Sequence, residues 1–200
     1  MWVKKYSGIG LIVLAVGCGA SKIQQQNQPG IQTKAALPEV KLTQEVLIGN
    51  WTSECHVDER SDTFVVEYLN FDLEENSHFS TFYLDKECTQ ILYQQTVNGT
   101  YLFSARGNYS ETRNQVAVTV GSSIAQGMFS TYQGFCGSRR WKLNEEQTFK
   151  DVTQCGLQKV MNSTLQARGN SGRTELTLKE CPSNSTECYT SVYFRSANRR

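Results

Sequence analysis

Apolar and polar residues alternate one by one through the middle of the chain, and this period of two most constrains the fold. In a β-strand successive side chains point to opposite faces, whereas a helix repeats its faces every 3.6 residues. The alternation predicts half-buried antiparallel strands, although Leu92, Gln95 and Leu102 interrupt it. The apolar positions fall in three runs, Ile91, Tyr93 and Val97, then Tyr101, Phe103, Ala105 and Tyr109, then Val116, Val118 and Val120.

The dipeptide Asn98-Gly99 lies between two of these runs and predicts a two-residue β-hairpin. Other segments rich in β-branched or aromatic residues flank the central runs, and turn residues recur between them at short intervals. These segments are 47–54, 64–71, 79–84, 174–178 and 189–195. The pattern predicts an all-β domain, either an antiparallel up-and-down barrel or half-barrel, or a sandwich.

Residues 157–168 fit either a helix or a strand. Leu157, Val160, Met161, Thr164 and Leu165 are spaced like a helix face, with Gly169 as a possible stop. The alternative is a strand over 161–167 that turns through residues 169–172 and pairs with 174–178. We favour the strand, because Gly156 and two β-branched residues weaken the helix.

The first eighteen residues have the layout of a secretory signal. Lys4 and Lys5 precede an apolar run over 9–16, which is too short to span a bilayer stably. The run ends in Leu14-Ala15-Val16-Gly17-Cys18, which resembles the lipobox of bacterial lipoproteins. The resemblance implies removal of residues 1–17 and lipidation of Cys18. Gly19, in place of Asp, implies sorting to the outer membrane; an ordinary cleaved signal is the alternative.

The next segment is predicted to be a flexible tether between a lipid anchor and a folded domain. Residues 18–42 contain two of the three prolines and no aromatic residue, so they cannot bury enough surface to offset their ordering entropy. The two acyl chains of the anchor and an amide-linked chain would attach the protein stably to a membrane. We expect one β-barrel-like domain over residues 43–200.

The chain has seven cysteines, an odd number that lipidation of Cys18 reduces to six. Six cysteines allow many pairings, and sequence alone does not choose among them. We favour three disulfides: Cys181 with Cys188, which enclose a short polar segment, then Cys136 with Cys155, and Cys55 with Cys88. Disulfides indicate an oxidising compartment and argue against a catalytic cysteine. The lack of a Cys-x-x-Cys pair argues against a metal site.

Gly49-x-Trp51 resembles the signature of lipocalins, in which the Trp closes one end of the barrel against an Arg near the last strand. The resemblance makes Arg195 the expected cation–π partner of Trp51. Residues 46–109 are also similar to the domain of the adenomatosis polyposis coli down-regulated proteins. The shared motifs are Gly49-x-Trp51-x-x-x-Cys55, Tyr83-x-Asp85-x-x-Cys88 and Gly99-x-Tyr101. This similarity implies a lipocalin-like barrel with an apolar cavity that binds a lipid.

Nothing in the sequence indicates catalysis or a cofactor. Nucleophile-elbow, phosphate-loop and zinc-protease motifs are lacking, and His56 and His78 are interpreted as polar turn residues. The segment 121–127 is interpreted as a surface loop. Twenty Lys and Arg against 19 Asp and Glu argue against a nucleic-acid-binding surface.

The sequence therefore predicts a non-catalytic envelope lipoprotein that binds a hydrophobic or lipid-like ligand. The alternative is a structural or protein-interaction module of the envelope whose barrel is filled by its own side chains. An enzyme that uses His56 with Asp58 is the least favoured hypothesis.

The assignment of Cys18 to lipid attachment predicts that the mature chain has no free thiol. A thiol-specific reagent should not label the denatured, unreduced protein, and should label six cysteines after reduction. One reactive thiol per unreduced chain would contradict the assignment.

Overall fold

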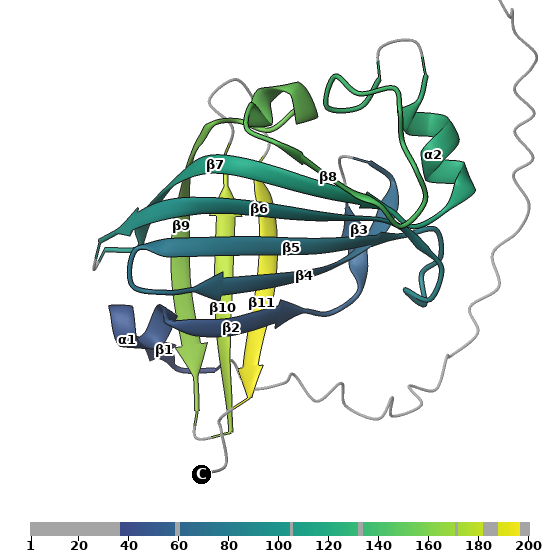
Figure 1. Ribbon diagram of the computed structural model, residues 1–200. Helices are drawn as coiled ribbons and strands as arrows, with labels where there is room; N and C mark the ends of the chain where they lie inside the picture. Colours follow the sequence, from purple (N-terminus) through teal and green to yellow (C-terminus); the bar gives the residue numbers. More distant parts are fainter. Residues whose placement is uncertain are drawn as a thin grey trace, which may run out of the picture. The chain divides into compact units, whose positions relative to one another are not determined.

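The computed structural model describes residues 37–58, 61–104, 106–131, 134–170, 172–181 and 188–196 (Figure 1). The predicted signal, Cys18 and most of the predicted tether lie outside the described residues. The strands are β1 (Glu39–Val40), β2 (Gly49–Ser53), β3 (His56–Asp58), β4 (Thr63–Phe71), β5 (Glu75–Tyr83), β6 (Ile91–Phe103), β7 (Asn108–Val120), β8 (Glu146–Phe149), β9 (Val160–Gly169), β10 (Arg173–Glu180) and β11 (Tyr189–Ser196). The helices are α1 (Gln44–Leu47), α2 (Ser123–Phe129) and a 3-10 turn, Val152–Cys155.

Eight strands form a closed antiparallel barrel in the order β2-β4-β5-β6-β7-β9-β10-β11. Each strand pairs with the next one in this order, β7 pairs with β9, and β11 pairs back with β2. In Figure 1, β4 to β7 run across the view while β9 to β11 cross behind them. The up-and-down barrel is therefore confirmed, and the half-barrel and the sandwich are not what forms. The remaining strands, β1, β3 and β8, pair with β9, β4 and β7.

The hairpin predicted at Asn98-Gly99 is wrong, because both residues lie inside the continuous strand β6. A two-residue hairpin there would put Val97 and Tyr101 on opposite faces, whereas a continuous strand keeps both in the core. The strand irregularity at this point is a β-bulge in the pairing with β7. The chain turns later, between Phe103 and Asn108, where the Ser104 amide donates to the Asn108 carbonyl at 2.9 Å.

The bulge lies where β7 changes its second neighbour. Residues 108–112 of β7 pair with β9, and residues 116–119 pair with β8. The extra residue in β7 keeps Val116 and Val118 on the same inner face as Tyr109. Gly99 is required at this point, since a Cβ there would lie 2.5 Å from the Thr112 carbonyl oxygen.

The ambiguous segment over 157–168 contains strand β9, as favoured, with alternating buried and exposed residues. It turns onto β10 through a hydrogen bond from the Asn170 amide to the Arg173 carbonyl at 3.0 Å. The strand also completes the barrel, because it pairs with β10 on one side and with β7 on the other.

All three favoured disulfides are present, Cys55–Cys88, Cys136–Cys155 and Cys181–Cys188. The last one joins the end of β10 to the residue before β11, which shortens the effective loop between two paired strands. Native disulfides in secreted domains typically contribute about 2–4 kcal/mol each.

Two expectations near the ends of the barrel need revision. The stretch assigned to the tether includes β1, which pairs with β9, and Leu42, which is buried in the core. The segment interpreted as a surface loop forms most of α2, whose first turn is capped by the Ser122 hydroxyl. This helix buries Ala125 and Phe129 against a second apolar cluster, which also contains Trp141.

Replacing Gly99 with Ala should destabilise the barrel by about 1–3 kcal/mol, because the new methyl group would overlap the backbone of β7. Gly127→Ala is the matched control. Its Cβ meets nothing within 4 Å and it lies in α2, so the substitution should stabilise the protein by about 0.5–1 kcal/mol. Urea denaturation measures both, and equal effects would contradict the role given to Gly99.

Candidate functional site

The three residues predicted to close one end of the barrel lie together. The guanidinium of Arg195 lies 4.5 Å from the centre of a Trp51 ring. It also donates to the carbonyls of Ile48 at 2.7 Å and Val46 at 2.9 Å, which holds the end of α1 against β11. Gly49 has φ of 121°, and a Cβ there would lie 3.3 Å from Arg195 Nη1. Gly49, Trp51 and Arg195 therefore form one latch.

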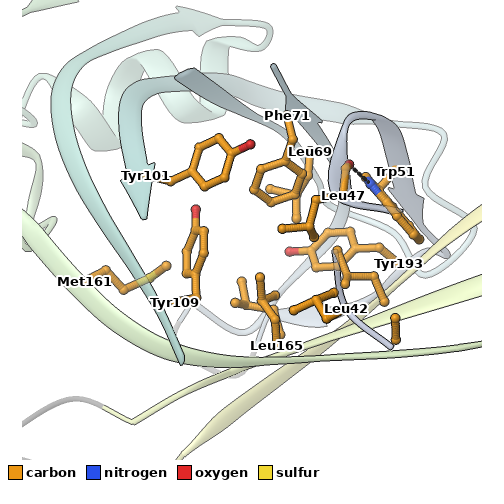
Figure 2. Close-up of a cluster of buried hydrophobic side chains, with 13 residues drawn as sticks. Leu42, Leu47, Trp51, Leu69, Phe71, Tyr101, Tyr109, Met161, Leu165 and Tyr193 are labelled. Carbon is orange, nitrogen blue, oxygen red and sulfur yellow. Dashed lines mark hydrogen bonds between the residues drawn. The ribbon is translucent and has the colours of Figure 1, made fainter. Parts of the chain in front are cut away.

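Above this latch the barrel is packed with its own side chains (Figure 2). Trp51 Nε1 donates to the Leu47 carbonyl at 2.8 Å, so the buried indole has its one polar atom satisfied. Phe71 contacts Tyr101 and Tyr109 edge to face, with centroids 5.1 and 6.1 Å apart. This end resembles the filled barrel of the alternative hypothesis.

A layer of charged residues crosses the barrel beyond the packed end. Glu67 on β4 is buried, and its Oε1 accepts from His78 Nε2 on β5 at 2.9 Å. Its Oε2 accepts from the Tyr193 hydroxyl on β11 at 3.1 Å and lies 3.7 Å from His56 Nε2 on β3. Four strands therefore converge on one carboxylate.

Both histidines had been interpreted as turn residues, and both lie in strands instead. His78 faces inward because it shares the parity of Asn76, Ser80 and Phe82, which are buried along β5. His56 is oriented by a 2.9 Å hydrogen bond from its Nδ1 to the Glu54 carbonyl, which directs Nε2 toward Glu67. The polar neighbours of each histidine concealed this alternation.

The electrostatics of the layer depend on these contacts. Burial by itself raises the pKa of Glu67, but the neighbouring His78 and His56 and the hydrogen bonds from His78 and Tyr193 outweigh it and lower the pKa to about 2. Burial and the nearby Glu67 charge raise the pKa of Tyr193. Glu67 is therefore an ionised carboxylate in the barrel interior, with Tyr193 as a neutral donor.

A second polar group lies where β7 pairs with β9. Glu111 and Arg113 are only 2% and 7% exposed, and Arg113 Nε lies 3.6 Å from Glu111 Oε2. That distance permits an ion pair but is too long for a hydrogen bond. Asn76 Nδ2 donates to the Tyr109 hydroxyl at 2.9 Å. Four buried atoms lack a hydrogen-bond partner among the described residues: Asn76 Oδ1, Glu111 Oε1, Arg113 Nε and Ser163 Oγ.

Two adjoining hollows reach these charged residues from the end opposite the latch. The outer hollow has a volume of about 440 Å³ and is lined by β3, β4, β5 and β11, including Val57, Val65 and Phe82. The inner hollow, of about 70 Å³, is lined by residues that include Arg113, Met161 and Leu178. Their walls share Glu67, Phe82, Tyr189 and Ser191. Together they form a cavity whose walls carry both apolar side chains and titratable ones.

Glu67, Glu111 and Arg113 were not identified from the sequence, although one signal was available. Each lies at an inward-facing position of an alternating strand. Glu67 lies between Val65 and Leu69 in β4, and Glu111 and Arg113 follow Tyr109 on the same face of β7. A charge at such a position faces the core and requires partners. The partners lie on other strands, so only the folded barrel shows which residues they are.

No protein-family model matches the chain, and no curated protein matches it in sequence. Within the described residues, no group of three or more His, Cys, Asp or Glu side chains is arranged to hold a metal ion. None of the described helices has the length and apolar character needed to cross a bilayer.

Glu67→Gln should destabilise the protein in a pH-dependent way. A carboxylate whose pKa falls from 4.5 to about 2 on folding stabilises the native state above pH 4.5, and this contribution is lost as the pH falls toward 2. The difference in unfolding free energy between wild type and variant should therefore be largest near pH 5, by about 3 kcal/mol, and should shrink toward pH 2.

Urea denaturation at pH 5 and pH 2.5 measures the unfolding free energy of wild type and Glu67→Gln. Glu146→Gln is the control, because the Glu146 side chain is exposed. A gap between wild type and Glu67→Gln that is equal at pH 5 and pH 2.5 would contradict the ionised, paired state of Glu67.

Proposed function

We propose that this protein is a bacterial outer-membrane lipoprotein whose barrel binds a lipid-like ligand without catalysis. The observation that carries the proposal is the cavity at the end opposite the latch, whose lining combines apolar side chains with charged ones. Its outer part, of about 440 Å³, falls in the range of small-molecule sites. The lipobox at Cys18 supports attachment to the membrane, and the three disulfides support an oxidising compartment.

The lining favours an amphipathic ligand over a purely apolar one. Val57, Val65 and Phe82 provide apolar contact near the mouth, and Glu67 and His56 lie in the same wall. A fully apolar ligand would cover these charged groups without replacing their hydrogen bonds to water, which costs free energy. The lipocalin-like expectation of an apolar cavity is thus narrowed to a ligand with an apolar body and a polar head.

The contacts of Glu67 support binding rather than chemistry. Its two oxygens are held by His78 and Tyr193, and its pKa of about 2 makes it a weak base near neutral pH. A general base works best with a pKa near the working pH.

The alternative function is a protein-interaction module of the envelope, and one observation favours it. Leu73 and Leu102 are 66% and 78% exposed, and both line a groove of about 570 Å³ that also includes Tyr101 and Phe103. Exposed apolar residues beside a groove are typical of sites that bind other proteins. The latched end of the barrel, which is filled by its own side chains, agrees with this second function.

A bulky side chain in the outer hollow should weaken ligand binding. Val57 lines the outer hollow and is 50% exposed, so Val57→Trp can occupy that space without disturbing the core. We expect it to weaken the binding of a fluorescent fatty acid or lysophospholipid roughly tenfold or more. Full-length chain with Cys18→Ser, which carries no anchor to compete, is titrated with the probe.

Val160→Trp is the matched control, because Val160 is also an exposed strand valine, at 48%, and lines neither hollow. It should leave the affinity unchanged. Saturable binding that survives Val57→Trp would place the ligand elsewhere, and no saturable binding by the unmodified barrel would overturn the proposed function.

A further inference from the structure

Arg113 is the buried cation of the barrel whose hydrogen bonds are least complete. It projects from β7 into the inner hollow and is only 7% exposed. Its Nη2 donates to the thioether sulfur of Met161 at 2.8 Å, and its Nε has no hydrogen-bond partner among the described residues. A thioether is a weak acceptor, and Glu111 lies too far for a hydrogen bond.

The other charges at this depth have partners inside the barrel, although those of Glu111 are incomplete. Glu67 is held by His78 and Tyr193, with His56 nearby. Burial, and then the nearby charge of Glu111, raise the pKa of the adjacent Tyr109, and Glu111 Oε2 lies 3.6 Å from Arg113 Nε. Burying a guanidinium without its hydrogen bonds costs several kcal/mol, so an acceptor at Arg113 would recover free energy that the protein alone does not.

The space beside Arg113 fits a small head group. The inner hollow of about 70 Å³ corresponds to roughly two water molecules at about 30 Å³ each, which is also the scale of a carboxylate. The outer hollow of about 440 Å³ adjoins it, and Val57, Val65 and Phe82 give it an apolar surface for a hydrocarbon chain beside its polar residues. A guanidinium recognises carboxylates through paired N–H donors, so these two spaces match the two parts of one ligand.

We infer that Arg113 receives the carboxylate of a straight-chain fatty acid that enters the barrel head first. This inference rests on the proposed function and names the class of ligand for the same cavity. The hydrocarbon chain then lies along Val65 and Phe82, toward the mouth. Two carboxylates in the inner wall, Glu67 and Glu180, oppose this binding, and Asp58 does so in the outer hollow. Glu67 is held by hydrogen bonds from His78 and Tyr193. Glu180, at the end of β10, is only partly buried, so water screens its charge.

The test compares ligands that differ only in the head group. Ten-carbon straight-chain carboxylate, alcohol and amine are titrated by calorimetry into the full-length Cys18→Ser chain. We expect the carboxylate to bind roughly tenfold to a hundredfold more tightly than the alcohol, as charge-assisted hydrogen bonds usually contribute, and the amine to bind most weakly. This comparison requires no substitution in the barrel.

Variants then assign the preference to Arg113. Arg113→Gln by itself leaves Glu111 buried without its cation, so the paired variant Arg113→Gln with Glu111→Gln keeps the interior neutral. This double variant should lose the preference for the carboxylate while binding the alcohol as before. Glu111→Gln alone should retain the preference, and Glu180→Gln should strengthen carboxylate binding because it removes the opposing charge.

The outcomes separate this inference from the function on which it rests. If carboxylate and alcohol bind equally, or if the double variant keeps the preference, the role of Arg113 is overturned while the ligand-binding function stands. Tighter binding of the amine also overturns it, and indicates that the acidic residues select the ligand. If none of the three ligands binds, both the inference and the proposed function fail.

Discussion

The pairing of β7 with β9 is the constraint on which the rest of the structure depends. Only residues 108–112 and 160–164 take part, yet without this contact the eight strands would form an open sheet with two exposed edges. Closure removes these edges, and every second side chain of each strand then faces the same interior. The latch of Arg195 on Trp51 and α1 then covers one end of that interior.

Closure also explains why charged residues are stable inside the barrel. Glu67, Glu111 and Arg113 come from strands that meet only because the sheet is closed on itself. In the interior each charge loses hydration, and its neighbours must replace it. Glu67 is compensated by three strands, whereas Arg113 is compensated incompletely. This contrast is the reason for proposing a ligand contact at Arg113 and not at Glu67.

The bulge opposite Gly99 separates two parts of the barrel that differ in strand pairing and packing. Before it, β7 pairs with β9 and the interior is packed around Tyr109 and Phe71. Beyond it, β7 pairs with β8 instead, and the hollows lie in this part of the molecule, beside residues such as Val65, Phe82 and Val97. The change of strand partner therefore separates two packed apolar clusters, and the outer hollow adjoins the second cluster at Val65 and Phe82. The closely fitted Gly99 is the local feature that permits it.

The sequence by itself determined the strand class and the candidate latch residues Gly49, Trp51 and Arg195, and it favoured an up-and-down order and the three disulfides that the structure contains. These features depend on local periodicity, short spacings or recognisable motifs, so they can be predicted before folding. The hairpin prediction at Asn98-Gly99 was wrong because turn propensity is a local property. In the complete barrel Val97 and Tyr101 are buried on one face of β6, and this burial overrides the local preference. The tertiary structure alone decided that His56, His78 and Tyr193 share Glu67, and that Arg113 faces a cavity. Such contacts join strands that are distant in sequence. They form only in the closed barrel, where the exclusion of water strengthens them.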